Sequence, residues 1–229
     1  MKSSILRSCS FALAIFGIVG CAGAEPAIDT DDTESMSYDG LYRVTGSAAD
    51  AAWMHPDIDL SSYTKIMVQG VGIAYRPGGV PGRFYDPSRD EHFIVTDEQK
   101  ERFRALVRET FREELAKSTR FTIVTEPGPD VLLIRGGLLD VVSYVPADPI
   151  GTSDIYLSRV AEVTLVLELR DSLSGAIVAR AVDRRAAEDR ARGFRKSNRV
   201  ANTAEVRRVI YGWAKLLRER LDTFGLSTN

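Results

Sequence analysis

The side chains that could do metal chemistry in this chain are its two histidines and the acids near them. His55 lies close to Asp57, and His92 lies close to Asp90. A mixed histidine and carboxylate site could bind a divalent metal if the two loops met. Neither segment has the ligand spacing of a strong metal motif, so surface acids beside single histidines are the favoured interpretation. We therefore predict no metal site.

Paired carboxylates are the next candidates for chemistry. Glu162 and Glu168 fall on the polar face of one predicted strand, but six residues at about 3.3 Å each put them too far apart for a close catalytic pair. Arg170, Arg180 and Arg184 are plausible cross-strand partners. A solvated, salt-bridged face is therefore the favoured interpretation of these acids.

Nucleophiles and cofactor motifs give no better pattern. The chain has no Gly-x-Ser-x-Gly elbow, and Gly70-Val71-Gly72 lies inside a predicted strand without a helix opening after it. Asp140 ends a buried-looking run and could be a strained or catalytic acid, although a strand-end carboxylate is the simpler interpretation. We expect no catalytic residue, no cofactor and no enzymatic activity.

The two cysteines indicate where the protein is targeted and do not indicate a catalytic role. Residues 1–20 begin with Lys2 and Arg7, contain no acid and continue into the apolar run 11–19, which is shorter than the roughly 20 residues of a membrane span. This pattern predicts a signal peptide. The segment Ile18-Val19-Gly20-Cys21 resembles the lipobox of bacterial lipoproteins, so Cys21 is expected to carry lipid and Cys9 to leave with the signal. An ordinary signal cleaved after residues 22–24 is the alternative.

The lipobox resemblance also implies a location. Several acyl chains on Cys21, palmitate among them, would hold the protein stably in a membrane, whereas one chain binds only marginally. Lipoproteins with alanine after the cysteine, here Ala22, resemble those sorted to the outer membrane, with the body on the periplasmic side. Residues 21–40 contain six acids and no base, which predicts a flexible, extended tether.

Residues 41–229 are expected to form a single folded domain. Strands are predicted over 63–76, 121–124, 131–145, 160–170 and 176–184, with a bulge or bend at Gly136-Gly137. Helices are predicted after a capping box at Thr96-Asp97-Glu98-Gln99 and after Asn202. Because both helices have one apolar stripe, we expect an α/β (α+β type) two-layer sandwich: a mixed, largely antiparallel sheet of about five strands with two main helices on one face.

Charge is distributed unevenly along the domain. Residues 183–199 contain seven bases and three acids, although the whole chain has a formal charge of −2. Such a basic loop could contact lipopolysaccharide phosphates, cell-wall polymer or an acidic envelope protein, while nucleic acid is not expected. The alternative is a solvated loop whose arginines pair with neighbouring acids. The candidate partner surface consists of Arg184, Arg185, Arg190, Arg192, Arg195 and Lys196.

Several segments together resemble a known family. They are residues 63–77, 128–141, the Ser174–Ala186 pattern SG-x(5)-RA-x-DRRA, and 211–222. The ordered set is similar to a family of bacterial envelope lipoproteins described as domain of unknown function 3313. The resemblance covers most of the domain and implies no catalytic residue.

Three functions remain open from the sequence. The first is a non-catalytic binding or assembly module that uses the loop at 77–95, the loop at 183–199 or an open sheet edge. The second is a cell-wall or lipid hydrolase whose carboxylates meet only in the fold, and the third is a multimeric transport or secretion component. A pocket that holds Asp140 or Glu162 with a second acid or His92 would favour the hydrolase.

Overall fold

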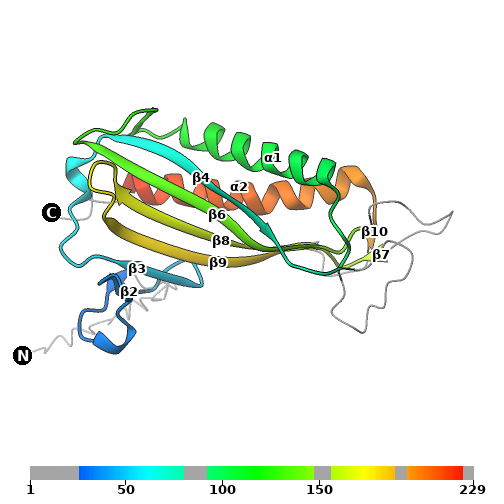
Figure 1. The fold of residues 1–229 in the computed structure, drawn as a ribbon, viewed down its shortest axis with the longest axis horizontal. Helices are drawn as coiled ribbons and strands as arrows, with labels where there is room; N and C mark the ends of the chain where they lie inside the picture. Colours follow the sequence, from blue (N-terminus) through cyan, green and yellow to red (C-terminus); the bar gives the residue numbers. More distant parts are fainter. Residues whose placement is uncertain (1–25, 80–91, 147–155, 189–194, 224–229) are drawn as a thin grey trace, which may run out of the picture.

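Two long helices cover one face of a curved sheet in this protein (Figure 1). The computed structural model describes residues 26–79, 92–146, 156–188 and 195–223. The helices are α1 (Asp97–Leu115) and α2 (Arg199–Thr223), with short 3-10 turns η1 (Thr33–Ser35) and η2 (Leu60–Ser62). The strands are β1 (Ala27–Ile28), β2 (Tyr42–Thr45), β3 (Ala51–Met54), β4 (Lys65–Tyr75), β5 (Thr122–Val124), β6 (Val131–Ser143), β7 (Tyr156–Leu157), β8 (Arg159–Asp171), β9 (Ile177–Glu188) and β10 (Arg195–Lys196).

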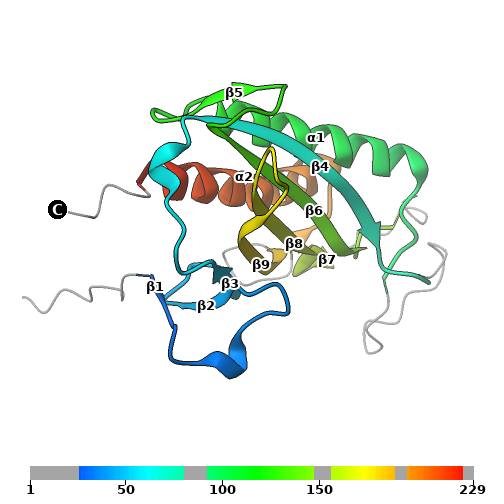
Figure 2. The ribbon, with the colours of Figure 1, turned by 60° about the vertical axis from the view of Figure 1, so that its left-hand side comes forward.

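The main sheet has eight strands in the order β1-β2-β3-β9-β8-β6-β4-β5, and β7 pairs with β10 separately. Only β4 forms parallel pairs, with β5 and β6, and the other neighbours are antiparallel. The predicted mixed, largely antiparallel α/β sandwich is therefore confirmed. The expected count of about five strands was too low, because β1, β2 and β3 are short and carry little apolar alternation. Figure 2 shows these three strands extending the sheet away from the helices.

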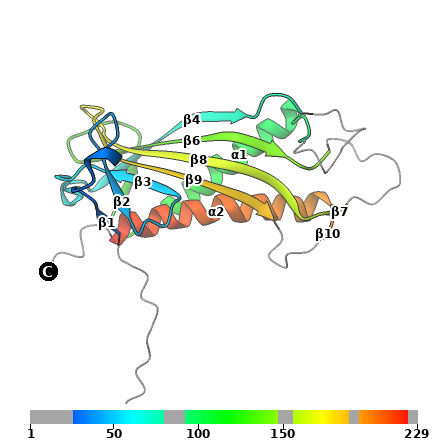
Figure 3. The same cartoon turned by 90° about the horizontal axis from the view of Figure 1, so that it is seen from below.

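The core lies between the helices and the alternate residues of the central strands. Leu165, Leu167 and Leu169 of β8 are buried on this inner face, as the predicted alternation requires. One cluster includes Ile66, Leu132 and Leu221, and a second includes Leu138, Val163, Ile210 and Trp213. We call the opposite side of the sheet, which is turned away from the helices, the outer face (Figure 3). The intervening residues of β8, among them Glu168 and Arg170, belong to this face.

Two irregularities lie in places that differ from the prediction. The bulge expected at Gly136-Gly137 is found opposite them, between Gly70 and Gly72 of β4, and a second interrupts β6 between Leu139 and Val142. Asp140, within this second bulge, has a φ of 53°, the left-handed region that aspartate tolerates better than most residues. The glycine pair in β6 thus lies opposite a bulge of the neighbouring strand β4 and does not itself interrupt β6.

The ordered structure begins earlier than the sequence suggested. Residues 26–40, expected to belong to a flexible acidic tether, contain β1 and η1. Asp32 caps η1, and the Asp39 carboxylate lies 2.5 Å from Arg180 of β9. The acids of this segment are therefore partly used in local hydrogen bonds and in a distant ion pair, which a count of charges does not reveal. Within the described residues, no helix is both long and apolar enough to cross a bilayer.

Candidate binding groove between the helices

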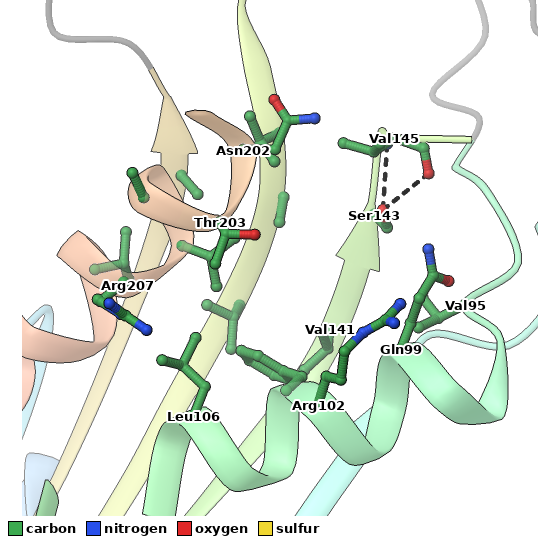
Figure 4. Close-up of a pocket in the computed structure, with 18 of the residues that line it drawn as sticks. Val95, Gln99, Arg102, Leu106, Val141, Ser143, Val145, Asn202, Thr203 and Arg207 are labelled. Atoms are coloured by element: carbon green, nitrogen blue, oxygen red, sulfur yellow. Dashed lines mark hydrogen bonds between the residues drawn. The ribbon is translucent and has the colours of Figure 1, made fainter. Parts of the chain in front are cut away.

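A large groove opens between α1 and the N-terminal half of α2, above one end of the sheet (Figure 4). Its volume is about 1990 Å³. The groove follows α1 from Glu98 to Glu113 and α2 from its cap at Asn198 to Tyr211. At a rise of about 1.5 Å per residue, each wall is about 20 Å long.

Polar contacts between the two helical segments are found toward their C-terminal ends. There, the Arg218 Nε lies 3.1 Å from Glu114 of α1, and the Ser118 hydroxyl donates to Asp222 over 2.5 Å. The same end carries the buried contacts of Leu115 and Leu221 in the first core cluster. Toward the N-terminal ends, the sheet between the helices is left as a floor.

The floor is apolar and the rim is charged. Val141 of β6 and Val160 and Val163 of β8 lie beneath the groove. The helices contribute Phe103, Leu106 and Val206. Figure 4 shows Leu106 and Arg102 of α1 on one side and Thr203 and Arg207 of α2 on the other. An apolar floor with polar groups at the edge is the usual form of a binding site.

The two walls differ in charge. Glu109 and Glu113 are exposed on the α1 wall, and Arg199 and Arg207 are exposed on the α2 wall. The remaining rim charges are mostly paired locally: Arg102 with Glu98 over 2.5 Å, and Arg208 with Glu205. The groove therefore has an acidic side and a basic side.

A capping side chain defines the start of each helix. Thr96 accepts from the Gln99 backbone and the Gln99 side chain accepts from the Thr96 backbone, so the predicted capping box is confirmed. The second helix begins at Arg199 rather than after Asn202. Asn198 provides its cap, because the Asn198 side chain accepts from the Ala201 backbone over 2.9 Å. The earlier start extends the α2 wall by one turn.

The acids considered as catalytic candidates are held by arginines. Glu162 is buried in β8 and bonds to Arg159 and, over 2.5 Å, to Arg184. Asp140 receives two hydrogen bonds from Arg76, at 2.7 and 2.5 Å. Those bonds hold the pKa of Asp140 below its usual value. The predicted salt-bridged face is confirmed, with Arg170 and Arg180 also bonded to Glu168.

The histidines do not meet. His55 lies beside β9, where its backbone donates to Val178, whereas the residue after His92 pairs with Ser143 at the far end of β6. No group of three or more potential metal ligands occurs within the described part of the chain. Asp140 and His92 are not among the residues that line the groove, and Glu162 lines it with its carboxylate already bonded to arginine. The pocket expected for a hydrolase is therefore not formed by these side chains.

The predicted basic surface is only partly described. Arg190 and Arg192 lie outside the described residues, as does Cys21, and the Arg195 side chain is likewise not described, while Lys196 is exposed in β10. Arg184 faces outward toward Glu162. Arg185 points to the opposite side, where its Nε lies 2.7 Å from Asp183. The role of these residues as a partner surface stays a prediction.

A buried polar cluster behind Arg185 could not be recognised from the sequence. Asp183 is 6% exposed and accepts hydrogen bonds from the Trp213 indole over 2.5 Å and from the Asp50 backbone over 3.1 Å. Arg185 also lies over the Trp213 ring. This cluster joins β3, β9 and α2, so it has a structural role. The one sequence feature that could have indicated this cluster is Asp183, an acid at a position of β9 that faces the core.

Comparison with known families gives one match. The model described as "Protein of unknown function (DUF3313)" matches residues 31–217. The comparison with curated proteins finds no match.

Solved structures resemble the chain only distantly. A PelC dodecamer from Paraburkholderia phytofirmans is 12% identical, with a TM-score of 0.34, over 72% of this chain and 96% of that chain. A Xanthomonas campestris protein of the DUF330 family is 14% identical, with a TM-score of 0.38, over 72% and 86%. A putative neuraminyllactose-binding hemagglutinin homolog from Helicobacter pylori is 9% identical, with a TM-score of 0.38, over 70% and 86%. Similarities at this level support no inference about function.

Proposed function

Because the chain belongs to the DUF3313 family of proteins of unknown function, we propose from its groove that it is a non-catalytic binding module, anchored by lipid in the bacterial cell envelope. The module holds a helical segment of a partner protein between α1 and α2. The observation that carries this proposal is the groove itself, with its apolar floor, its charged walls and its length.

The size of the groove supports a helix as its occupant. An α-helix has a diameter of about 10 Å with its side chains, so a segment about 20 Å long fills about 1600 Å³. The groove measures about 1990 Å³ and its walls have the same length. An amphipathic helix of about four turns would therefore complete the helical layer and cover the exposed part of the floor.

The charges on the walls support a particular kind of helix. A segment that places basic residues against Glu109 and Glu113, and acidic residues against Arg199 and Arg207, is complementary to both sides. Such complementarity favours one orientation and disfavours the reverse, in which like charges meet. The occupant thus carries an apolar stripe between one basic flank and one acidic flank.

The position of the groove supports a protein partner rather than a bilayer. β1 and β2 and the C-terminal end of α2 lie at one end of the molecule, whereas both helices begin at the other end (Figure 1). If the chain is tethered at Cys21, which precedes β1, the groove is at the end away from the membrane. A site in this position meets proteins in the periplasm before it meets lipid.

The proposal of a non-catalytic role rests on the ion pairs formed by the two candidate catalytic acids. Glu162 and Asp140 are bonded to Arg184 and Arg76, so both carboxylates are already held in ion pairs. General acid catalysis needs a carboxyl with a raised pKa, and the pKa of Asp140 is lowered instead.

Site-specific photo-crosslinking in intact cells tests this function. A crosslinking amino acid at Thr203, which is exposed within the groove, should capture one discrete partner, and the crosslinked segment should have apolar residues at helical spacing between charged flanks. The same amino acid at Lys215, exposed on α2 outside the groove, is the matched control. A crosslink of equal yield from both positions, or a captured segment without helical spacing, contradicts the proposal.

A further inference from the structure

One arginine of the outer face has no partner among the described residues, unlike its neighbours. Arg135 follows the core residues Leu132 and Ile134 on β6, and its place in the alternation turns it away from the helices. Its Nε is buried and has no hydrogen-bond partner among the described residues. The carboxylate opposite it, Glu168, is already bonded to two other arginines of the same face.

A second, smaller groove lies beside this guanidinium. Its volume is about 430 Å³, within the range of small-ligand sites. Gly72 and Gly137 leave room in it, and at Gly72 a side chain would meet no atom within 4 Å. The walls beyond the glycines are apolar, formed by Val166 and the exposed Leu139. Glu168 also lines the groove, beside Arg135, and its carboxylate is bonded to Arg170 and Arg180. The groove thus has a polar end, where Arg135 is the cation without a partner among the described residues, and an apolar end.

The unpaired donor has an energetic consequence. A buried N–H of a charged group without an acceptor loses the hydration it had in the unfolded chain and gains nothing in return. A planar guanidinium offers two parallel N–H groups, which match the two oxygens of a carboxylate. Because Arg135 lines the groove, a carboxylate bound there would give this guanidinium an anionic partner that it lacks among the described residues.

We propose that Arg135 binds a carboxylate carried on a short apolar chain, with the chain lying over Gly137 and Val166 toward Leu139. The charge of Arg135 sets the preference for an anion, and the walls set the preference for an apolar chain. This site is on the opposite side of the sheet from the groove between the helices, so it is independent of the function proposed above.

Two sources supply this chemistry, namely a free carboxylic acid and the C-terminus of a peptide. The second source is available because β4, which borders the groove, pairs with β5 only over Lys65–Met67. Its later residues Val68 and Ala74 are exposed. A peptide lying along this open edge would add backbone hydrogen bonds to the carboxylate contact.

The site is tested by NMR on the chain from residue 21 with Cys21→Ser, which keeps every described residue. The Arg135 Nε–H signal, assigned by its loss in Arg135→Lys, should shift saturably with hexanoate at a Kd of about 1 mM, a value typical of a ligand of this size. Hexanamide, its neutral isostere, should produce no saturable shift. A tetrapeptide ending in a leucine carboxylate that binds at least about tenfold tighter than hexanoate would identify the peptide source.

A matched pair of variants places the site. Val166→Glu puts a carboxylate diagonally across from Arg135, where it competes with the ligand, and should weaken hexanoate binding more than about tenfold. Val166→Gln has the same size without the charge and should stay within about threefold of the unmodified chain. The proposal is overturned if hexanoate at about 50 mM gives no saturable shift, if hexanamide acts equally, or if Val166→Glu binds like Val166→Gln.

Discussion

Glu114 is a nearly fully buried carboxylate at the C-terminal end of α1, where it meets two cations. Lys117 lies 2.6 Å from one of its oxygens, and Arg218 of α2 lies 3.1 Å from the other. The hydrogen bond from Lys117, followed by that from Arg218, holds the pKa of Glu114 below its ordinary value of 4.5. This residue therefore joins the two helices where the α1 wall of the groove ends.

Glu114→Gln should lower the free energy of unfolding at neutral pH by about 1–2 kcal/mol, because two charge-assisted bonds become neutral ones. A carboxyl whose pKa is lowered in the fold stabilises above its unfolded pKa, and that contribution disappears as the pH falls through the lowered value. The difference between the two proteins should thus shrink from about pH 4.5 downward. Urea unfolding at several pH values measures it.

The exposed neighbour Glu113 supplies the control for this experiment. Glu113→Gln should change the unfolding free energy by less than about 0.5 kcal/mol. If Glu114→Gln and Glu113→Gln gave the same pH dependence, the two cations would not be the cause of the stabilisation.

Some individual contacts could be predicted from the sequence and others could not. The pairing of Glu168 with Arg170 and Arg180 follows from alternation along neighbouring strands, which places these residues on one face. The contact of Asp183 with Trp213 does not follow, because it joins two elements whose relative position depends on the whole core. Likewise, it depends on where other arginines point that Arg135 has no partner in the described part of the chain.

At the scale of elements, the start of α1 is defined by its capping box. Thr96→Ala should destabilise the protein by about 1 kcal/mol, because the backbone N–H of Gln99 loses its acceptor. Thr125→Ala, at an exposed position after β5, is the control and should have little effect. Equal changes in thermal unfolding for the two variants would show that the cap contributes nothing.

The long elements could be predicted because each has a strong periodic pattern. The alternation in β8 and the apolar stripes of both helices determine which side of each element is buried. The short strands β1, β2 and β3 have too few residues for a pattern, and their place is determined by pairing with β9. The predicted start of α2 was one turn too late, because Asn198 and Asn202 offer the same capping chemistry and the helix uses Asn198.

At the scale of the whole molecule, the proposed anchor and the proposed binding groove are at opposite ends. Cys21→Ser should move the protein from the membrane fraction to the soluble fraction, since a single signal-derived cysteine would carry all the acyl chains. Cys9→Ser should leave the distribution unchanged, because that residue would be removed with the signal. Membrane retention of Cys21→Ser would contradict the anchor.

The groove itself could not be predicted from the sequence, although both helices could. The groove is open because the distance between the two helices changes along their length. The helices contact each other through Glu114 and Arg218, and they diverge toward Gln99 and Thr203. No local pattern records this divergence. The same limit applies to the Arg135 site, which requires three strands to be in register.

The pairing of β3 with β9 also determines the order in which the chain can fold. Ala51 lies opposite Val182, so β1, β2 and β3 pair with one another but cannot join the rest of the sheet until β9 is available. The inner face is covered only when α2 adds Ile210 and Trp213. Contacts this distant in sequence make folding slow, because a long loop must close before they form. A chain released residue by residue, from a ribosome or through a membrane pore, therefore cannot reach its native state before its last quarter has emerged.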